Sequence, residues 1–505
     1  MPNANLYALL ESHFPPDHNA VAIETPQRHY SWNDIRQTTA RLAGFLNSLD
    51  LPAGARVAVQ VEKSPEALML YLATLRAGLV YLPLNTAYRA GEVDYFLSDA
   101  EPSVVVCASK NLDWIEPLAQ RSGTAYVHTL DEDGSGSLFR AAMNQPDHFD
   151  TAISQPDDLA AILYTSGTTG RSKGAMLSHR NLTSNALVLN DYWGWRSDDV
   201  LLHMLPIFHV HGLFVAAHGA LLAGARMIWL PRFDVDAALR YLPQSTVMMG
   251  VPTFYVRLLA DPRFTRDVCR TLRLFVSGSA PLLADTFSDF QRRTGHTILE
   301  RYGMSETNML TSNPYDPSLG ERRGGTVGKP LPGVGVRVVD DANQPLPDGE
   351  IGHVQVRGDN VFSGYWRMPE KTREEFTVDG WFKTGDVGRW DEKHYLTIVG
   401  RSKDLIISGG FNIYPKEIET LIDEWPGVAE SAVIGVPHPD FGEAVVAVVV
   451  PRPGVVLDGP GLIAGLKSQI ANFKVPKQVH VVQELPRNTM GKVQKNILRQ
   501  TYQKE

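Results

Sequence analysis

The 505-residue chain has few cysteines and no excess of basic residues. Its two cysteines, Cys107 and Cys269, can form neither a disulfide framework nor a cysteine-rich zinc site, which favours a reducing compartment. The 48 lysines and arginines are outnumbered by 56 acidic residues, and the formal net charge is −8. Because a nucleic-acid-binding protein would normally show a basic excess, we expect no nucleic-acid partner.

We also expect neither a targeting sequence nor a membrane-spanning apolar run. No Lys or Arg precedes Arg28, which argues against a secretory signal or an arginine-rich transit peptide. The most apolar stretch, residues 212–230, is interrupted by His218, Gly224 and Arg226, whereas a membrane-spanning helix needs about 20 mostly apolar residues. We therefore expect a cytoplasmic protein without a membrane partner.

Short apolar runs alternate with longer helical patterns over the first three hundred residues. Strands are expected at residues 56–61, 103–107, 246–251 and 272–276, and a helix with proline at its first position at residues 65–77. Apolar residues make up 43% of the chain, enough for a sizeable core. This β–helix–β rhythm predicts an α/β fold of mainly parallel sheets covered by helices.

The texture changes toward the C-terminus. Period-two runs with tight turns at about residues 325–400 predict a small barrel-like β subdomain. The last hundred residues read as a compact, mobile α+β domain, so we predict domains at residues 1–402 and 403–505. Residues 466–505 carry eight Lys or Arg against two acids, which makes this end locally basic.

A phosphate-binding loop is the strongest local signal, at residues 164–174. Glycines let backbone N–H groups approach oxyanions, hydroxyls add donors, and a lysine adds positive charge. The loop follows the apolar run 159–163 and precedes a helix expected near Ser178, but it is not a P-loop, because Ser172 stands where that motif needs glycine. The expected nucleotide contacts, which the resemblance described next assigns to ATP, are Thr165, Ser166, Gly167, Thr168, Thr169, Gly170 and Lys173.

This loop resembles that of the acyl-adenylate-forming enzymes, the AMP-binding superfamily, and the resemblance covers nearly the whole chain. It implies that Tyr302 faces the adenine, that the hydroxyl of Ser305 (usually Thr in the family) acts on the α-phosphate, and that Glu306 holds Mg²⁺. The further ATP or AMP contacts implied by the resemblance are Ser279, Ala280, Glu300, Gly303, Met304, Asp386 and Arg401.

The resemblance also implies two half-reactions, in which ATP activates a carboxylate as an acyl-adenylate and the thiol of CoA then displaces AMP. Lys492 is implied as the catalytic lysine of the first step, by positioning and electrostatics. Lys403 falls at the family's hinge position, about which the small domain reorients. Gly410, next to Gly409, falls where the pantetheine arm of CoA passes close to the backbone.

Arg301 is the residue that says most about the substrate, because family members that take apolar or aromatic acids generally carry a non-basic residue at this position. A guanidinium can bind a second carboxylate bidentately. The pattern at residues 300–304 resembles that of malonyl-CoA synthetases, which implies ligation of malonate, and also methylmalonate, to CoA, with Ser277 and His209 lining the pocket. The alternative is that Arg301 pairs with Glu300 or a phosphate and says nothing about the substrate.

Other interpretations stay open. His209 and His211 are two apart, as in some zinc sites, but no third ligand of comparable spacing follows, and we interpret His211 as structural. The rival functions are a ligase for another short or aryl acid, an adenylation enzyme that loads a carrier-protein thiol, a luciferase-like monooxygenase and a non-catalytic relative. A lysine acetyltransferase acting on Lys492 is a further predicted partner.

Overall fold

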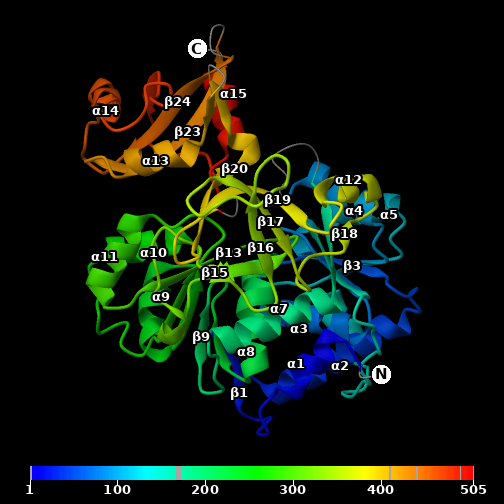
Figure 1. Ribbon diagram of the computed structural model, residues 1–505. Helices are drawn as coiled ribbons and strands as arrows, with labels where there is room; N and C mark the ends of the chain where they lie inside the picture. The colour runs from blue at the N-terminus through cyan, green and yellow to red at the C-terminus, as the bar shows by residue number, and fades with distance from the viewer. Residues whose placement is uncertain (1–2, 166–171, 409–410, 439–441, 489–490, 504–505) are drawn as a thin grey trace.

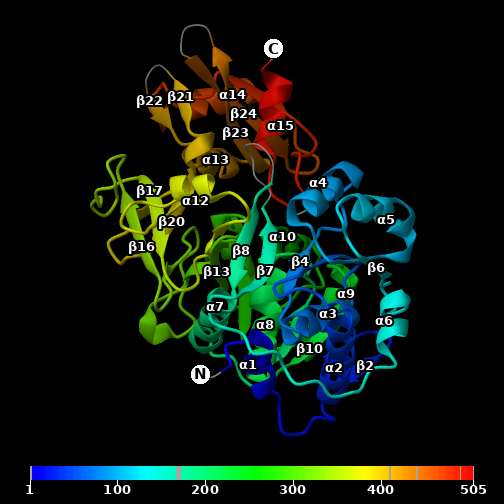
Figure 2. The ribbon, with the colours of Figure 1, turned by 90° about the vertical axis from the view of Figure 1, so that its right-hand side faces the viewer.

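The structure is a computed structural model that describes residues 3–165, 172–408, 411–438, 442–488 and 491–503. A large body contains two extended sheets and a smaller antiparallel one, and a second, smaller body built around its own sheet stacks on one end of it (Figures 1 and 2). The N-terminus lies at the opposite end in both views. The expected α/β architecture with a small C-terminal domain is confirmed.

The first large sheet has the strand order β18-β8-β7-β4-β3-β5-β6. Its strands β3 to β7 run parallel, and β8 and β18 add antiparallel pairs at one edge. The bounds are β3 (Arg56–Gln60), β4 (Val80–Pro83), β5 (Val104–Cys107), β6 (Tyr126–Thr129), β7 (Leu159–Tyr164), β8 (Gly174–Ser178) and β18 (Gly364–Tyr365).

The second large sheet has the order β15-β14-β13-β12-β11-β9-β10-β1-β2. Its central strands are parallel and its two ends carry antiparallel pairs. The bounds are β1 (Val21–Glu24), β2 (His29–Ser31), β9 (Val200–His203), β10 (Arg226–Trp229), β11 (Val247–Gly250), β12 (Leu274–Ser277), β13 (Ile298–Met304), β14 (Asn308–Ser312) and β15 (Lys329–Pro330).

Helices cover and separate these sheets. α3 is buried along its whole length; Ser64 caps it by accepting from the backbone N–H of Ala67, and Pro65 begins it as predicted. The helices of the large body are α1 (Leu6–Ser12), α2 (Trp32–Ser48), α3 (Pro65–Arg76), α4 (Ala90–Ala100), α5 (Leu112–Arg121), α6 (Ser137–Ala142), α7 (His179–Tyr192), α8 (His218–Ala223), α9 (Val235–Tyr241), α10 (Pro252–Ala260), α11 (Ala284–Thr294) and α12 (Pro369–Glu375). A π-helix, η2 (His211–Ala217), leads into α8, and short 3₁₀ turns are η1 (Ser109–Asn111), η3 (Leu242–Gln244), η4 (Pro317–Leu319) and η5 (Ser402–Asp404).

The segment with period-two runs forms a four-stranded antiparallel sheet, β16-β17-β19-β20. Its strands are β16 (Gly335–Val339), β17 (Gly352–Arg357), β19 (Phe382–Trp390) and β20 (Leu396–Arg401). In the register of β19 with β20, Asp386 is opposite Arg401. The predicted boundary between residues 402 and 403 falls in η5, directly after β20, and the division itself stays a prediction.

The smaller body has the sheet β22-β21-β24-β23, with β25 added parallel to β24, and its own apolar core. It contains β21 (Ile406–Ser408), β22 (Phe411–Ile413), α13 (Pro415–Asp423), β23 (Val428–His438), β24 (Gly442–Pro451), α14 (Gly459–Leu466), β25 (Gln478–Val481) and α15 (Lys495–Tyr502). α13 packs on β23 and also contacts β20 of the large body. Within the described residues, no helix is both long and apolar enough to cross a bilayer.

Candidate active site

Three predicted nucleotide contacts lie together at the junction of β13, β19 and β20. Asp386 is 4% exposed and accepts from the phenol of Tyr302. On its other oxygen, Asp386 pairs with Nε of Arg401 at 2.8 Å, and Arg401 also donates to the carbonyl of Thr384 at 3.0 Å. Burial, followed by the charge of Asp386, raises the pKa of Tyr302. The carboxylate of Asp386 is thus fixed next to the aromatic ring of Tyr302. This arrangement suits a nucleoside, with its ribose hydroxyls at the carboxylate and its purine at the ring.

Glu306, two residues after β13, is the candidate Mg²⁺ ligand. Its Oε1 accepts from the hydroxyl of Tyr365 at 3.0 Å, and burial raises its pKa. The described part of the chain contains no group of three or more His, Cys, Asp or Glu side chains placed to hold a metal. A single buried carboxylate fits Mg²⁺ bound mainly through ATP phosphates and water, because Mg²⁺ is usually held by one or two carboxylates plus substrate phosphates.

The phosphate loop is described only at its two ends, and Ser166, Gly167, Thr168, Thr169 and Gly170 lie outside the described residues. The backbone N–H of Thr165 donates to the carbonyl of Lys173 at 2.9 Å and closes the base of the loop. The ammonium of Lys173 lies 3.6 Å from a carboxylate oxygen of Glu375 and 4.3 Å from the centre of the Tyr365 ring.

The helix expected near Ser178 is present as α7, but the strand before it was not expected. The loop joins two antiparallel strands, β7 and β8, and so does not lead directly from a strand into the helix. Ser178 does cap that helix, by accepting from the backbone N–H of Asn181 at 3.2 Å. The apolar run 174–178 pairs with β7, so a helix N-terminus does not directly follow the loop.

The residues predicted to bind the acid include Ser277 at the end of β12 and Arg301 in the middle of β13. Arg301 on β13 is 3% exposed, and its Nε and Nη2 have no hydrogen-bond partner in the described structure. Oγ of Ser277, at the end of β12, and Nε2 of His209 also have no hydrogen-bond partner in the described structure. Burial lowers the pKa of Arg301 to about 9, and it lowers that of His209, together with the charge of Lys492, to about 3. An unsatisfied buried guanidinium is costly, which points to an anionic ligand.

Glu300 does not neutralise Arg301 directly. Successive residues of a strand point to opposite faces, and Oε1 of Glu300 instead accepts from the backbone N–H of Leu282 at 3.1 Å. Burial raises the pKa of Glu300 to about 8. Among the described side chains, no ion pair joins Glu300 to Arg301, which disfavours the interpretation of Arg301 as the structural partner of Glu300.

Lys492 comes from the smaller body. Its backbone N–H donates to Oδ1 of Asn488 at 3.0 Å, and its carbonyl accepts from the backbone N–H of Asn488 at 2.9 Å. As a whole, Lys492 is an exposed residue. Desolvation of its ammonium is nevertheless the main cause that lowers its pKa. The carboxylates of Asp386 and Glu306 act in the opposite direction and raise this pKa. The ammonium of Lys492 therefore lies within electrostatic range of Asp386 and Glu306, the predicted ribose and metal residues.

The remaining predicted residues are placed as follows. Ser279 and Ala280 lie in the turn after β12, and Gly303 and Met304 end β13. Ser305 follows directly on Met304. Lys403 lies in η5, where burial lowers its pKa. Gly409 and Gly410 lie outside the described residues.

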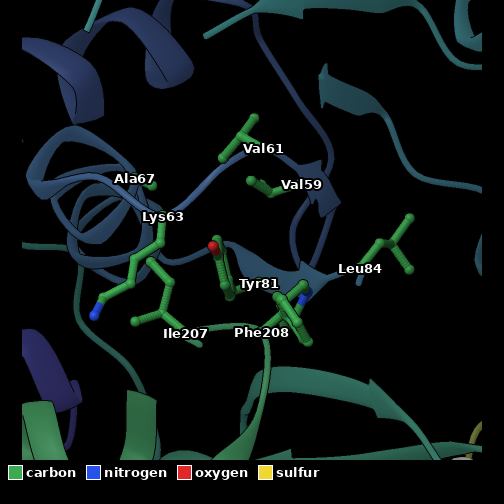
Figure 3. Close-up of a pocket in the computed structure, with 9 residues that line it drawn as sticks. Val59, Val61, Lys63, Ala67, Tyr81, Leu84, Ile207 and Phe208 are labelled. Atoms are coloured by element: carbon green, nitrogen blue, oxygen red, sulfur yellow. The ribbon is translucent and has the colours of Figure 1, made fainter. Parts of the chain in front are cut away.

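The sequence did not point to Lys63, a buried lysine that lies close to Ile207 and Phe208, just before His209. The ammonium of Lys63 donates to Nδ1 of His203 at 2.9 Å, to the carbonyl of His203 at 2.9 Å and to the carbonyl of Leu230 at 2.6 Å. Lys63 also lines a cavity of about 10 Å³ with Ile207 and Phe208, room for at most one water (Figure 3). It thus ties the ends of β9 and β10, in the second sheet, to the chain that follows β3 of the first sheet. Its partners lie at least 140 residues away in the chain, and no local signal identifies them.

We expect Lys63→Met to lower the free energy of unfolding by about 3 kcal/mol or more, because each buried acceptor left without a donor costs about 1–3 kcal/mol. Urea unfolding of the intact chain, followed by tryptophan fluorescence, measures this. Lys110→Met is the matched control, since that lysine is exposed and its pair with Glu62, at 2.9 Å, contributes little. Equal unfolding midpoints for the two variants would contradict the anchoring role.

The fold is that of an adenylate-forming enzyme. Residues 11–366 match the AMP-binding enzyme family, and residues 417–492 match the AMP-binding enzyme C-terminal domain. The chain therefore belongs to the AMP-binding enzyme family, which confirms the resemblance found in its sequence.

Known proteins extend this result. The chain is 35% identical over 535 residues to a malonate–CoA ligase of Arabidopsis thaliana, covering 96% of this chain and 86% of that protein. Its structure is similar to that of ATP-bound MatB from Rhodopseudomonas palustris, with a TM-score of 0.96, 57% identity and 99% coverage of both chains. The TM-score against apo MatB is 0.86, at 56% identity and 99% coverage of both chains. The arrangement described here is therefore nearer to the ATP-bound form.

Proposed function

We propose that this enzyme joins malonate, and also methylmalonate, to CoA through an acyl-adenylate, with release of AMP and pyrophosphate. The observation that carries the proposal is the buried guanidinium of Arg301, whose Nε and Nη2 have no hydrogen-bond partner in the part of the chain that the structure describes. The malonate–CoA ligase among its relatives supports the same substrate. The proposed location is the cytoplasm.

In the first half-reaction, an oxygen of the reacting carboxylate attacks the α-phosphorus of ATP, and the bond to pyrophosphate breaks. Two anions must meet, so positive charge is needed at the point of attack. Lys492 supplies it from the smaller body, and the hydroxyl of Ser305 donates to the α-phosphate. Mg²⁺, held by Glu306 and phosphate oxygens, would neutralise further charge. Arg301 holds the distal carboxylate and so orients the acid.

In the second half-reaction, the thiol of CoA attacks the carbonyl carbon of the adenylate and AMP leaves. Lys492 has no role in this step, and its position against the nucleotide residues would obstruct the thiol. Rotation at Lys403 would remove it and bring Gly409 and Gly410 to the pantetheine arm. A lysine acetyltransferase that modified Lys492 would stop the first step alone, and mass spectrometry of the acetylated protein tests whether that residue is a target.

A substrate panel tests the proposal. We expect malonate and methylmalonate to give AMP, pyrophosphate and acyl-CoA when ATP, Mg²⁺ and CoA are present. Propionate and benzoate should give kcat/KM values at least about 100-fold lower, because they leave the guanidinium of Arg301 unpaired in a desolvated pocket. Faster turnover of benzoate than of malonate would favour the aryl-acid alternative. Pyrophosphate release without any CoA thioester would favour a carrier-protein thiol as acceptor.

A further inference from the structure

His211 lies at the same turn as Arg301, and no part of the mechanism above uses it. It is the first residue of the π-helix η2 and is 4% exposed. Its Nδ1 lies 3.3 Å from Oγ of Ser279, whereas its Nε2 is buried and has no hydrogen-bond partner in the described structure. A buried polar atom without a partner calls for an explanation, and an unbound ligand is one.

The turn Ser277–Gly278–Ser279 brings the two side chains together. The guanidinium of Arg301 lies over Gly278, since a methyl group there would be 2.6 Å from both Nε and Nη1 of Arg301. Ser279, the next residue, contacts His211. His211 and Arg301 therefore lie against the same three-residue turn, to which Ser277 belongs. Each of these three side chains has a polar atom without a hydrogen-bond partner in the described structure.

The backbone around His211 is held firmly. His203 donates through Nε2 to the carbonyl of Gly212 at 2.9 Å, and its other ring nitrogen accepts from Lys63. The carbonyl of Pro206 packs so closely on the Cα of Gly212 that a side chain there would collide with it. A π-helical turn of this kind is frequent at functional sites, and here it places the His211 ring at a defined position.

We infer that His211 is a specificity-determining residue that donates a hydrogen bond from Nε2 to the distal carboxylate of the acid, beside Arg301. The inference rests on the proposed function and goes beyond the structural role that the sequence predicts for this residue. In this assignment the hydroxyl of Ser279 donates to Nδ1, which leaves the proton on Nε2. Together the imidazole and the guanidinium give the carboxylate donors from two directions, which a monocarboxylic acid cannot use.

The electrostatics agree with this assignment. Burial, followed by the charge of Arg301, lowers the pKa of His211 well below its ordinary value, and His203 and His209 act in the same direction. The ring is therefore neutral at neutral pH and carries one N–H. It adds a donor next to Arg301 without adding a second buried charge.

Two substitutions separate the two ring nitrogens. His211→Asn places an amide near the position of Nδ1 and keeps the contact with Ser279, whereas His211→Gln places an amide near the position of Nε2. We expect the KM for malonate to rise about 10- to 100-fold in His211→Asn, as for the loss of one hydrogen bond to a charged group, and to stay within a few-fold in His211→Gln. In both variants the KM for ATP should stay unchanged, and the kcat/KM for propionate should not fall.

The ratio of malonate to propionate kcat/KM is the deciding readout, because a purely structural role would lower both together. An unchanged ratio in His211→Asn, or an equal loss in the Asn and Gln variants, would overturn the inference and leave the proposed function standing. No malonate turnover by the unsubstituted enzyme would overturn the proposed function itself. If His211→Asn fails to fold, His211→Phe keeps the ring volume, removes both nitrogens and carries the same expected loss.

Discussion

Replacement of Lys492 by alanine is expected to slow acyl-adenylate formation by about 10²- to 10³-fold, the usual cost of removing one group that stabilises transition-state charge. Transfer of a supplied acyl-adenylate to CoA should stay near the wild-type rate. The reason is electrostatic: Lys492 lies within range of the charges of Asp386 and Glu306, and its positive charge has no task once pyrophosphate has left. The two half-reactions should therefore separate in a single variant.

Pyrophosphate release measures the first half-reaction, and thioester formation from synthetic malonyl-adenylate and CoA measures the second. Lys467→Ala is the matched control, because Lys467 is an exposed lysine of the same domain, at the end of α14. It should leave both rates unchanged. An equal loss of both half-reactions in Lys492→Ala would contradict the assignment and would indicate a general defect in domain docking.

Replacement of Arg301 by alanine is expected to lower kcat/KM for malonate by about 10²- to 10³-fold, because the distal carboxylate would then be buried without its charged partner. The KM for ATP should change by no more than a few-fold, since Tyr302, Asp386 and Arg401 are untouched. Arg301→Lys should recover only part of the activity, because an ammonium cannot bind a carboxylate through two parallel hydrogen bonds. Steady-state kinetics with each substrate varied separately gives these values, and undiminished malonate turnover in Arg301→Ala would sink the dicarboxylate proposal.

Gly278→Ala tests the same contact from the other side. The added methyl would displace the guanidinium, and this costs the fold little, since the group displaced is the far end of a flexible side chain. We expect a higher KM for malonate with an unchanged unfolding midpoint. Gly91→Ala is the control, because a methyl group there meets nothing within 4 Å and the backbone conformation is ordinary.

Most of the fold could be predicted from local pattern. The strands at 56–61, 103–107, 246–251 and 272–276 appear as β3, β5, β11 and β12, within two residues at each end. Apolar runs of this length bounded by turn residues are typical of buried parallel strands. β8 was missed because its five residues stand directly before a helix cap, and only pairing with β7 makes them a strand.

The site divides in the same way. Residue types and family resemblance were enough to nominate Tyr302, Asp386, Arg401, Glu306 and Lys492, because each belongs to a short recognisable motif. Lys63 belongs to no such motif, and the sequence predicted only a structural role for His211. Their importance rests on contacts between residues far apart in the chain, such as that of His211 with Ser279, 68 positions away.

The sequence by itself thus determined the class of enzyme, the sheet-and-helix rhythm and the cation, Arg301, at a position where family members that take apolar acids generally carry a non-basic residue. Only the tertiary structure decided that this cation has no hydrogen-bond partner among the described residues, that Gly278 makes room for it, and that His211 lies at the same turn. Burial and the absence of a hydrogen-bond partner are properties of packed neighbours in space, and no run of consecutive residues specifies them.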